Sequence, residues 1–228
     1  MLSTSIEDYI KAIYELEAEH RKATTKRIAA SLDVKMASVT GMIKHLAAEG
    51  FLQHTPYHGV HLTEKGRNVA VKMIRCHRII ELFLCRTLSL TWDEVDADAE
   101  VLEHAISDKL IERIYEYLGR PQFDPHGSPI PAKNGSLPPP RGLPLSDLPE
   151  GTRGSIVEVS DQDPEFLRYL TKLQLGIGTQ VCVGPREPFG GPVTLRRGAE
   201  TISLGPDAAR RIHVRIRRRP KRSKKSGR

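Results

Sequence analysis

The pattern of apolar and polar residues along the chain divides it into a helical front part and a β-rich back part. Apolar side chains in residues 1–118 recur three and four positions apart, which is the spacing of one helix face. Three such series, the second including His77, predict helices: Ile6, Ile10, Ile13 and Leu16; Val69, Met73, His77, Ile80 and Leu84; Ala99, Leu102, Ile106, Leu110, Ile114 and Tyr117. Thr4 and Glu7 are spaced as a capping box for the first helix.

The back part has short β-rich runs separated by Gly and Pro turns. They cover residues 155–159, 180–183, 193–195, 201–204 and 212–216. One helical stretch, residues 163–175, interrupts them. Short strands at this spacing predict a small β-barrel with one short helix.

A proline-rich segment separates the two parts. Residues 119–149 contain nine of the sixteen prolines. Because proline lacks a backbone N–H group and restricts its neighbour, this segment is expected to be an extended connection without a helix or a central strand.

Residues 24–48 have the pattern of a helix-turn-helix. A short helix over 24–32 is capped by Thr24 or Thr25, a break follows at residues 33–35, and a second helix over 36–48 buries Val39, Ile43 and Leu46. Residues 53–63, with Gly59 among them, indicate a hairpin wing. Residues 20–48 hold six Lys/Arg and one acid, which favours contact with phosphates. The alternative is an ordinary helical hairpin with a solvated basic face. The candidate DNA-binding residues are Lys26, Arg27, Lys35, Ala37, Ser38, Thr40 and Lys44.

Several potential ligands of a hard metal ion recur on helix faces. Glu81 follows His77 by four residues, and Glu100, Glu103 and His104 are spaced for one face. Asp8 lies in the second turn of the first helix. A half-buried face with carboxylates and imidazole is costly unless a cation binds, and this donor set suits Mn²⁺ or Fe²⁺ better than structural zinc. Each residue alone also has a structural explanation, such as a core histidine or a solvated acidic face.

Composition and charge narrow the class of protein. The net charge is +7, but residues 215–228 hold nine Lys/Arg and no acid, so the remainder carries −2. A mean hydropathy of −0.38 and the lack of a long apolar run argue against a membrane span, and the acidic start is unlike a signal peptide. The three cysteines include no CxxC pair. We therefore expect a reduced, cytoplasmic protein.

At these residues the sequence resembles the diphtheria toxin repressor family of metal-dependent regulators, particularly its manganese transport regulator branch. The resemblance covers residues 5–217. It rests on these segments: Glu7-Asp8-Tyr9-Ile10, Ile13-Tyr14, Ser38-Val39-Thr40, Leu62-Thr63-x-x-Gly66, Glu103-His104 and Asp124-Pro125-His126-Gly127-x-Pro129-Ile130-Pro131.

The resemblance implies a mainly α-helical fold with a small β domain. Its expected parts are a winged helix-turn-helix DNA-binding domain (1–65), a helical dimerisation and metal-binding domain (66–131), a Pro-rich linker (132–149), an SH3-like, iron-transport-protein-A-like domain (150–217) and a basic tail (218–228). The implied main metal site consists of Asp8, His77, Glu100, Glu103 and His104. The implied second site consists of Glu81, Asp124, His126 and Asp161.

The sequence departs from some relatives at the implied sites. Iron-type members have Met and Cys where this chain has Asp8 and Glu100, which favours manganese. Short manganese regulators have an acid where this chain has Lys11, and a lysine there would oppose a closely spaced second cation. Asp124 replaces a Cys of some relatives.

The leading hypothesis is therefore a Mn²⁺-responsive homodimeric repressor of metal uptake genes that binds a palindromic operator in double-stranded DNA. It is expected to have no enzymatic activity, small-molecule substrate or membrane partner. An Fe²⁺-responsive regulator of the same family is the first alternative. A metal-dependent hydrolase and a nucleoid-type protein that binds DNA regardless of metal are alternatives from other classes, although no HExxH or nucleophile motif is present.

Overall fold

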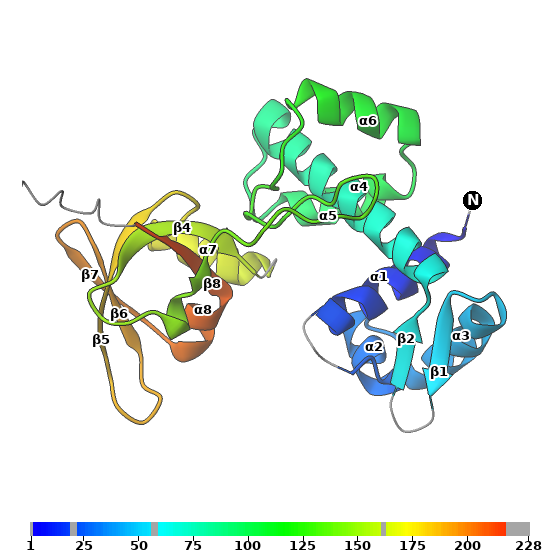
Figure 1. Ribbon diagram of the computed structural model, residues 1–228, viewed down its shortest axis with the longest axis horizontal. Helices are drawn as coiled ribbons and strands as arrows, with labels where there is room; N and C mark the ends of the chain where they lie inside the picture. Colours follow the sequence, from blue (N-terminus) through cyan, green and yellow to red (C-terminus); the bar gives the residue numbers. More distant parts are fainter. Residues whose placement is uncertain (1, 19–21, 56–58, 161–162, 218–228) are drawn as a thin grey trace, which may run out of the picture. The chain divides into compact units, whose positions relative to one another are not determined.

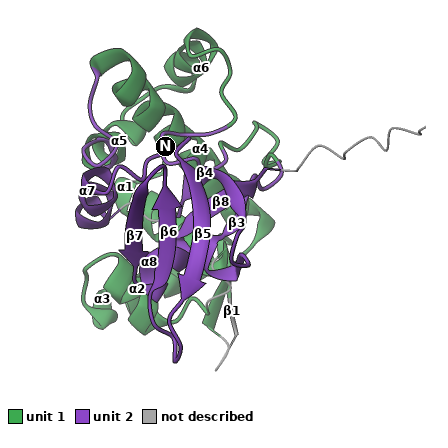
Figure 2. Cartoon of the chain, turned by 90° about the vertical axis from the view of Figure 1, so that its left-hand side faces the viewer, with its two compact units in different colours: residues 1–88, 97–122, 130–138 green, residues 89–96, 123–129, 139–228 purple. Residues whose placement is uncertain are grey.

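The computed structural model describes residues 2–18, 22–55, 59–160 and 163–217, which form two compact units (Figure 1). Unit 1 comprises residues 1–88, 97–122 and 130–138, and unit 2 comprises residues 89–96, 123–129 and 139–228 (Figure 2). Both units are discontinuous in sequence, whereas the sequence-based division runs in consecutive segments. That division remains a prediction about domains.

Unit 1 begins with three helices and a two-stranded hairpin. These are α1 (Thr4–Ala18), α2 (Thr25–Ser31), α3 (Met36–Ala48), β1 (Leu52–Thr55) and β2 (Gly59–Leu62). The strands pair antiparallel from Leu52 with Leu62 to Thr55 with Gly59. This arrangement confirms the predicted helix-turn-helix followed by a wing.

Local sequence explains the boundaries of the helix-turn-helix. The Thr24 side chain accepts a hydrogen bond from the backbone N–H of Arg27 and caps α2. Asp33 in the turn has φ = 50°, a left-handed conformation that aspartate tolerates better than most residues. Val39 and Leu46 of α3 are fully buried. Both helices therefore begin and pack where the apolar period predicts.

Two glycines allow close backbone approaches around the wing. A Cβ atom on Gly59, whose φ is +93°, would lie 2.9 Å from the carbonyl oxygen of Ala23. A Cβ atom on Gly66 would lie 2.1 Å from the carbonyl oxygen of Phe51. Thr63 caps the next helix by accepting a hydrogen bond from the N–H of Gly66. The spacing of Thr63 and Gly66 therefore has a structural cause.

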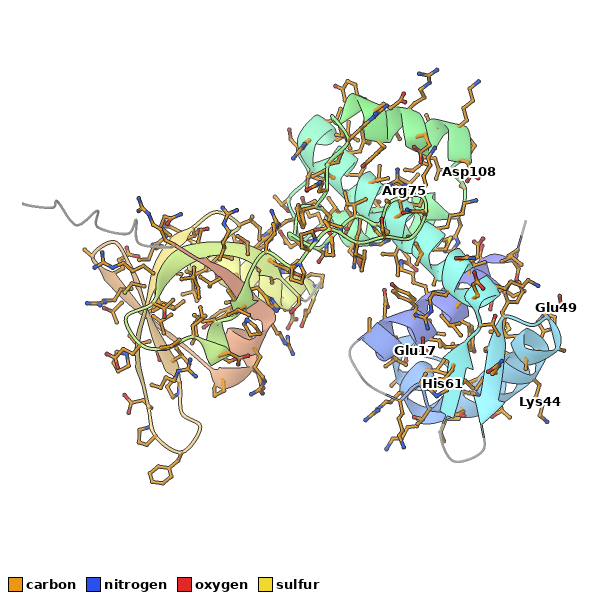
Figure 3. All side chains as sticks on the ribbon, viewed as in Figure 1. Glu17, Lys44, Glu49, His61, Arg75 and Asp108 are labelled. Carbon is orange, nitrogen blue, oxygen red and sulfur yellow. The ribbon has the colours of Figure 1, made fainter. Side chains whose placement is uncertain are left out.

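Three further helices complete the helical part: α4 (Glu64–Leu88), α5 (Val95–Glu103) and α6 (Asp108–Tyr117). The series predicted from Ala99 to Tyr117 is interrupted, because Ser107 caps the start of α6 through the N–H of Leu110. Leu102, Leu110 and Tyr117 are 43%, 52% and 72% exposed, so this series does not form a buried stripe. Arg75 of α4 donates to the carbonyl of Pro131 and to Glu112 of α6, which fastens residues 130–138 to this unit (Figure 3).

Unit 2 is built around a six-stranded antiparallel sheet of order β3-β8-β4-β5-β6-β7 (Figure 2). Its elements are β3 (Leu143–Pro144), the 3-10 helix η1 (Leu145–Asp147), β4 (Arg153–Val159), α7 (Pro164–Lys172), β5 (Gln180–Arg186), β6 (Val193–Arg197), β7 (Glu200–Leu204), α8 (Pro206–Arg211) and β8 (Ile212–Ile216). All five predicted strands and the predicted helix are present.

The end of the proline-rich segment differs from the prediction. Residues 143–147 form β3 and η1, and the side chains of Leu145 and Leu148 are 0% and 1% exposed in the core of unit 2. Burial of two leucines provides the driving force to order a segment whose prolines exclude a regular helix. The expectation that 119–149 is wholly extended was therefore wrong for its last residues.

No helix among the described residues is long and apolar enough to cross a membrane.

Candidate metal centre and DNA-binding surface

One end of α1 meets α5 and the residue that follows it in a cluster of carboxylates and an imidazole. Asp8 of α1, Glu100 of α5 and His104 offer ligand atoms that all lie within 4.8 Å of one another. Nε2 of His104 is 3.0 Å from Oδ1 of Asp8 and 3.9 Å from Oε1 of Glu103. The side chains of Asp8 and His104 are 29% and 12% exposed, so the group is partly shielded from water.

A second group shares Glu100 with the first. His77 of α4, Glu100 and Glu103 also offer ligand atoms within 4.8 Å of one another. Nδ1 of His77 is 2.5 Å from Oε2 of Glu103, and both side chains are almost fully buried. All five residues of the main site implied by resemblance therefore lie in one or both of these two groups.

Lys11 of α1 lies within the second group. Its Nζ atom is 2.7 Å from Oε2 of Glu100, 2.9 Å from Oε1 of Glu103 and 3.2 Å from Nδ1 of His77. Burial lowers the pKa of Lys11, but Glu103 and Glu100 outweigh it and leave the pKa above its usual value. The charged ammonium group of Lys11 therefore contacts His77, Glu100 and Glu103, the three members of the second group.

The first group retains uncompensated negative charge. Among the ion pairs of the described residues, the carboxylates of Asp8 and Glu100, with those of Glu7 and Glu103 beside them, meet one ammonium group, that of Lys11, which leaves −3 for these five residues. Burial raises the pKa of Asp8, and the charge of His104 opposes this effect. Because a partly buried excess of negative charge is costly, the donor set fits a divalent cation.

Glu7 has a role that the sequence analysis missed. Its Oε2 atom lies 2.8 Å from Nδ1 of His104, so the side chain does not form the expected capping box with Thr4. A carboxylate at Nδ1 orients the ring so that Nε2 faces Asp8. The sequence contained one signal, since Glu7 directly precedes the candidate ligand Asp8.

The residues of the implied second site belong to different units. Glu81 of α4 is fully buried in unit 1, where its Oε1 atom is 3.4 Å from Nε2 of His77. Asp124 and His126 are buried in unit 2. Asp161 lies outside the described residues.

The surroundings of His126 define which of its nitrogens carries hydrogen. Its Nε2 atom lies 2.7 Å from the carbonyl oxygen of Trp92, which can only accept, so Nε2 donates. Nδ1 of the neutral ring is then a potential ligand atom. Oδ1 of Asp124 accepts hydrogen bonds from the N–H groups of His126 and Ser128, which fixes the carboxylate within the loop.

The candidate DNA-binding side chains lie on the exposed surfaces of α2, α3 and the turn between them. Lys44 is on the outer side of α3 (Figure 3), opposite the buried Val39 and Ile43. Among the described residues, neither Lys35 nor Lys44 forms an ion pair. All seven predicted residues are exposed: Lys26, Arg27, Lys35, Ala37, Ser38, Thr40 and Lys44.

Glu17 connects α1 to the wing and was also missed by the sequence analysis. Its Oε1 atom is 3.1 Å from Nδ1 of His61 and accepts from the N–H of Leu62, while Oε2 accepts from Arg67 (Figure 3). The Glu17 carboxylate, which is 14% exposed, therefore adds polar contacts to the apolar packing between α1 and strand β2.

Three segments of the chain match models of known protein families. Residues 1–60 match the iron-dependent repressor N-terminal DNA binding domain, and residues 63–132 match the iron-dependent repressor metal binding and dimerisation domain. Residues 143–216 match the FeoA domain. The β sheet of unit 2 is the SH3-like part of the fold.

Relatives match over nearly the whole chain. The iron-dependent repressor IdeR of Mycobacterium tuberculosis (strain ATCC 25618 / H37Rv) is 30% identical over 224 residues, covering 93% of this chain and 97% of the relative. A solved manganese-dependent transcriptional repressor in complex with manganese is 37% identical, with a TM-score of 0.84 and coverage of 92% of this chain and 99% of that chain. The structure of ScaR with bound Zn²⁺ is 34% identical, with a TM-score of 0.80 and coverage of 92% and 98%.

The fold and the comparisons together define a metal-dependent, DNA-binding transcriptional repressor with a winged helix-turn-helix. More specifically, the chain belongs to the iron-dependent repressor family that includes IdeR and the diphtheria toxin repressor.

Proposed function

We propose that the protein is a Mn²⁺-responsive repressor of metal uptake genes, with the ion held by Asp8, Glu100, Glu103 and His104. The observation that carries this proposal is the convergence of these oxygen and imidazole donors between α1 and α5. Hard carboxylate oxygens without a thiolate suit Mn²⁺ or Fe²⁺. A bound ion would supply positive charge between the carboxylate of Asp8 on α1 and the donors Glu100, Glu103 and His104.

Iron is the second candidate for the same site. The relative from Mycobacterium tuberculosis is named an iron-dependent repressor, whereas the solved relative of 37% identity is named manganese-dependent. The absence of Met and Cys from the four donors favours manganese. Affinity for Mn²⁺ is intrinsically weaker than for Fe²⁺, so selectivity depends on coordination geometry and on the metals available.

His77 has a different role in this proposal from its expected one as a ligand of the main ion. Its Nδ1 atom is engaged by Lys11 and Glu103, and Lys11 supplies the positive charge that a second ion would bring there. We therefore propose a single divalent ion at the cluster, with His77 and Lys11 orienting Glu103.

The second site remains a proposal that involves Glu81, Asp124, His126 and Asp161. The orientation of His126 supports it, because a histidine ligand commonly donates its other ring N–H to a backbone carbonyl. The two backbone hydrogen bonds to Oδ1 of Asp124 preorganise the neighbouring carboxylate.

We further propose a homodimer that contacts a palindromic operator. Several apolar side chains of α5 and α6 are exposed, including Val101 at 73% and Tyr117 at 72%. Exposed apolar surface of this kind marks interaction sites, and these helices lie within the match to the dimerisation domain. A two-fold dimer presents two recognition helices to two half-sites. The expected readers are Lys26, Arg27, Lys35, Ala37, Ser38, Thr40 and Lys44.

A mobility-shift assay on the protein's own promoter region tests the proposed function. Retardation with Mn²⁺ at lower ion occupancy than with Fe²⁺ or Zn²⁺, and none with chelator, is the expected result for a cytoplasmic Mn²⁺-dependent regulator. Equal retardation with chelator would favour a nucleoid-type protein. Metal-dependent cleavage of the DNA or of ester substrates would favour the hydrolase alternative.

A further inference from the structure

The outer face of the sheet in unit 2 carries a row of arginines that the winged helix does not account for. Arg153 of β4 pairs with Cys182 of β5, and Cys182 pairs with Arg196 of β6. On the other side of β4 lies β8, which Arg217 directly follows. The backbone N–H of Arg217 donates to the carbonyl oxygen of Arg153. Directly paired residues point to the same face of a sheet, so the three arginines share one face across four neighbouring strands.

The row borders a concavity of about 410 Å³. Its lining consists of Arg153, Gln180, Val181, Cys182, Arg196, Gly198 and Arg217. Arg196 donates to Sγ of Cys182 at 3.6 Å. The lining includes no carboxylate. The three guanidinium groups can donate hydrogen bonds but cannot accept them.

This arrangement carries an electrostatic cost within the domain. Like charges on neighbouring strands destabilise a sheet, and none of the three arginines forms an ion pair with a described carboxylate. Two other exposed arginines of the same unit do have such partners, since Arg168 is 3.5 Å from Asp93 and Arg210 contacts Asp207. The positive charge of the arginine row is therefore not neutralised by a described carboxylate.

The dimensions of the row favour a polyanion. Neighbouring strands lie about 4.8 Å apart, so a row that crosses three strand spacings extends over about 14 Å. This length exceeds a single phosphate group and matches several phosphates along a nucleic-acid strand. In sequence, Arg217 is followed by residues 218–228, which contain seven Lys/Arg and no acid.

We propose that Arg153, Arg196 and Arg217 form a second DNA contact, which binds backbone phosphates independently of the winged helix. The guanidinium groups bind phosphate oxygens in the fork geometry that arginine favours. This contact adds affinity without reading bases and does not depend on which metal the protein senses.

The test compares two double variants with the same change in charge. Arg153→Gln/Arg196→Gln removes two arginines of the row, and Arg168→Gln/Arg210→Gln removes two ion-paired arginines of the same unit. Binding of the full-length protein to a random-sequence duplex is followed by fluorescence anisotropy between 50 and 200 mM salt. The row variant is expected to lower the salt slope by about 1.8, so that its affinity deficit is about 12-fold larger at 50 mM than at 200 mM salt. The control variant is expected to retain the wild-type slope.

A charge-preserving variant and a small-anion titration distinguish DNA binding by the row from other causes of a lower slope. Arg153→Lys/Arg196→Lys retains the charges and should retain most of the slope, while loss of slope in this variant would assign the effect to altered structure and overturn the proposal. Equal losses of salt slope in the two glutamine variants would assign the loss to net charge alone and would overturn the proposal. If the row variant binds DNA normally but loses NMR shifts that inorganic pyrophosphate induces in wild type at Cys182 and Gly198, the row is a small-anion site and the DNA assignment is wrong.

Discussion

The ammonium group of Lys11 contacts both carboxylate oxygens of Glu103, at 2.9 and 3.2 Å, although 92 positions separate the two residues. The side chain of Glu103 is fully buried and that of Lys11 is 12% exposed. The pair therefore joins α1 of the DNA-binding domain to the end of α5 through a charge that belongs to the protein itself.

Replacement of this charge should have opposite effects on stability and on metal binding. Lys11→Gln leaves the buried Glu103 carboxylate without its ammonium partner, so the metal-free protein should lose about 3–5 kcal/mol of unfolding free energy. Mn²⁺ should bind more tightly, because the cluster becomes more negative. Urea unfolding with chelator and calorimetric Mn²⁺ titration measure the two effects. Lys109→Gln on the exposed surface of α6 is the control, and a weaker Mn²⁺ affinity in Lys11→Gln would contradict the proposed electrostatics.

Removal of Glu103 should abolish the response to metal. Glu103→Ala deletes an anionic donor within reach of His104 and the buried partner of Lys11, so Mn²⁺ should no longer increase operator affinity. The measurement is a mobility shift with and without Mn²⁺, with circular dichroism to confirm folding. Glu150→Ala, at an exposed position of unit 2, should respond as wild type. An unchanged metal dependence in Glu103→Ala would show that the ion binds elsewhere.

Lys44 provides a test of the proposed recognition helix. Lys44→Ala removes an exposed charge from α3, so affinity should fall on all DNA sequences about equally and the salt slope should fall by about 0.9. Fluorescence anisotropy on operator and random duplexes measures both quantities. Lys109→Ala should leave them unchanged. Equal slopes for Lys44→Ala and wild type would mean that this part of α3 does not contact phosphates.

Glu17 should affect DNA binding without affecting metal binding. Its carboxylate holds His61, Leu62 and Arg67, so Glu17→Ala should loosen the wing relative to α1 and weaken operator binding by the Mn²⁺-loaded protein. The loss of these charge-assisted hydrogen bonds should also cost about 1–3 kcal/mol of unfolding free energy. Calorimetry should give the wild-type Mn²⁺ affinity. A matched loss of Mn²⁺ affinity would indicate general unfolding instead of a local effect on the wing.

Cys76 should be chemically inert in the folded protein. Burial, with a smaller contribution from Glu103, raises the pKa of its thiol to about 12, so at pH 8 only about one thiol in 10,000 is ionised. In a Cys85→Ser/Cys182→Ser background, iodoacetamide should label Cys76 only after unfolding in urea, as measured by mass spectrometry. Rapid labelling of the native protein would contradict the burial of this part of α4.

Elements with a local periodicity could be predicted from the amino-acid sequence alone. α3 begins at Met36 and ends at Ala48 as the pattern of Val39, Ile43 and Leu46 predicts, because capping, turn formation and burial of one face depend on residues within a few positions of each other. The chemical types of the metal donors were also evident from sequence, since spacing of three and four residues is enough to place Glu100 and Glu103 of α5 and the following His104 near one another.

Contacts between side chains of different elements could not be predicted from these local patterns. The contact of Glu7 with His104, the position of Lys11 among the carboxylates and the burial of Leu145 all join residues that are distant in sequence. The row of Arg153, Arg196 and Arg217 likewise depends on strand order and register. The physical reason is that helix and strand periods fix positions on a single element, whereas contacts between elements follow from how several buried faces pack together at once.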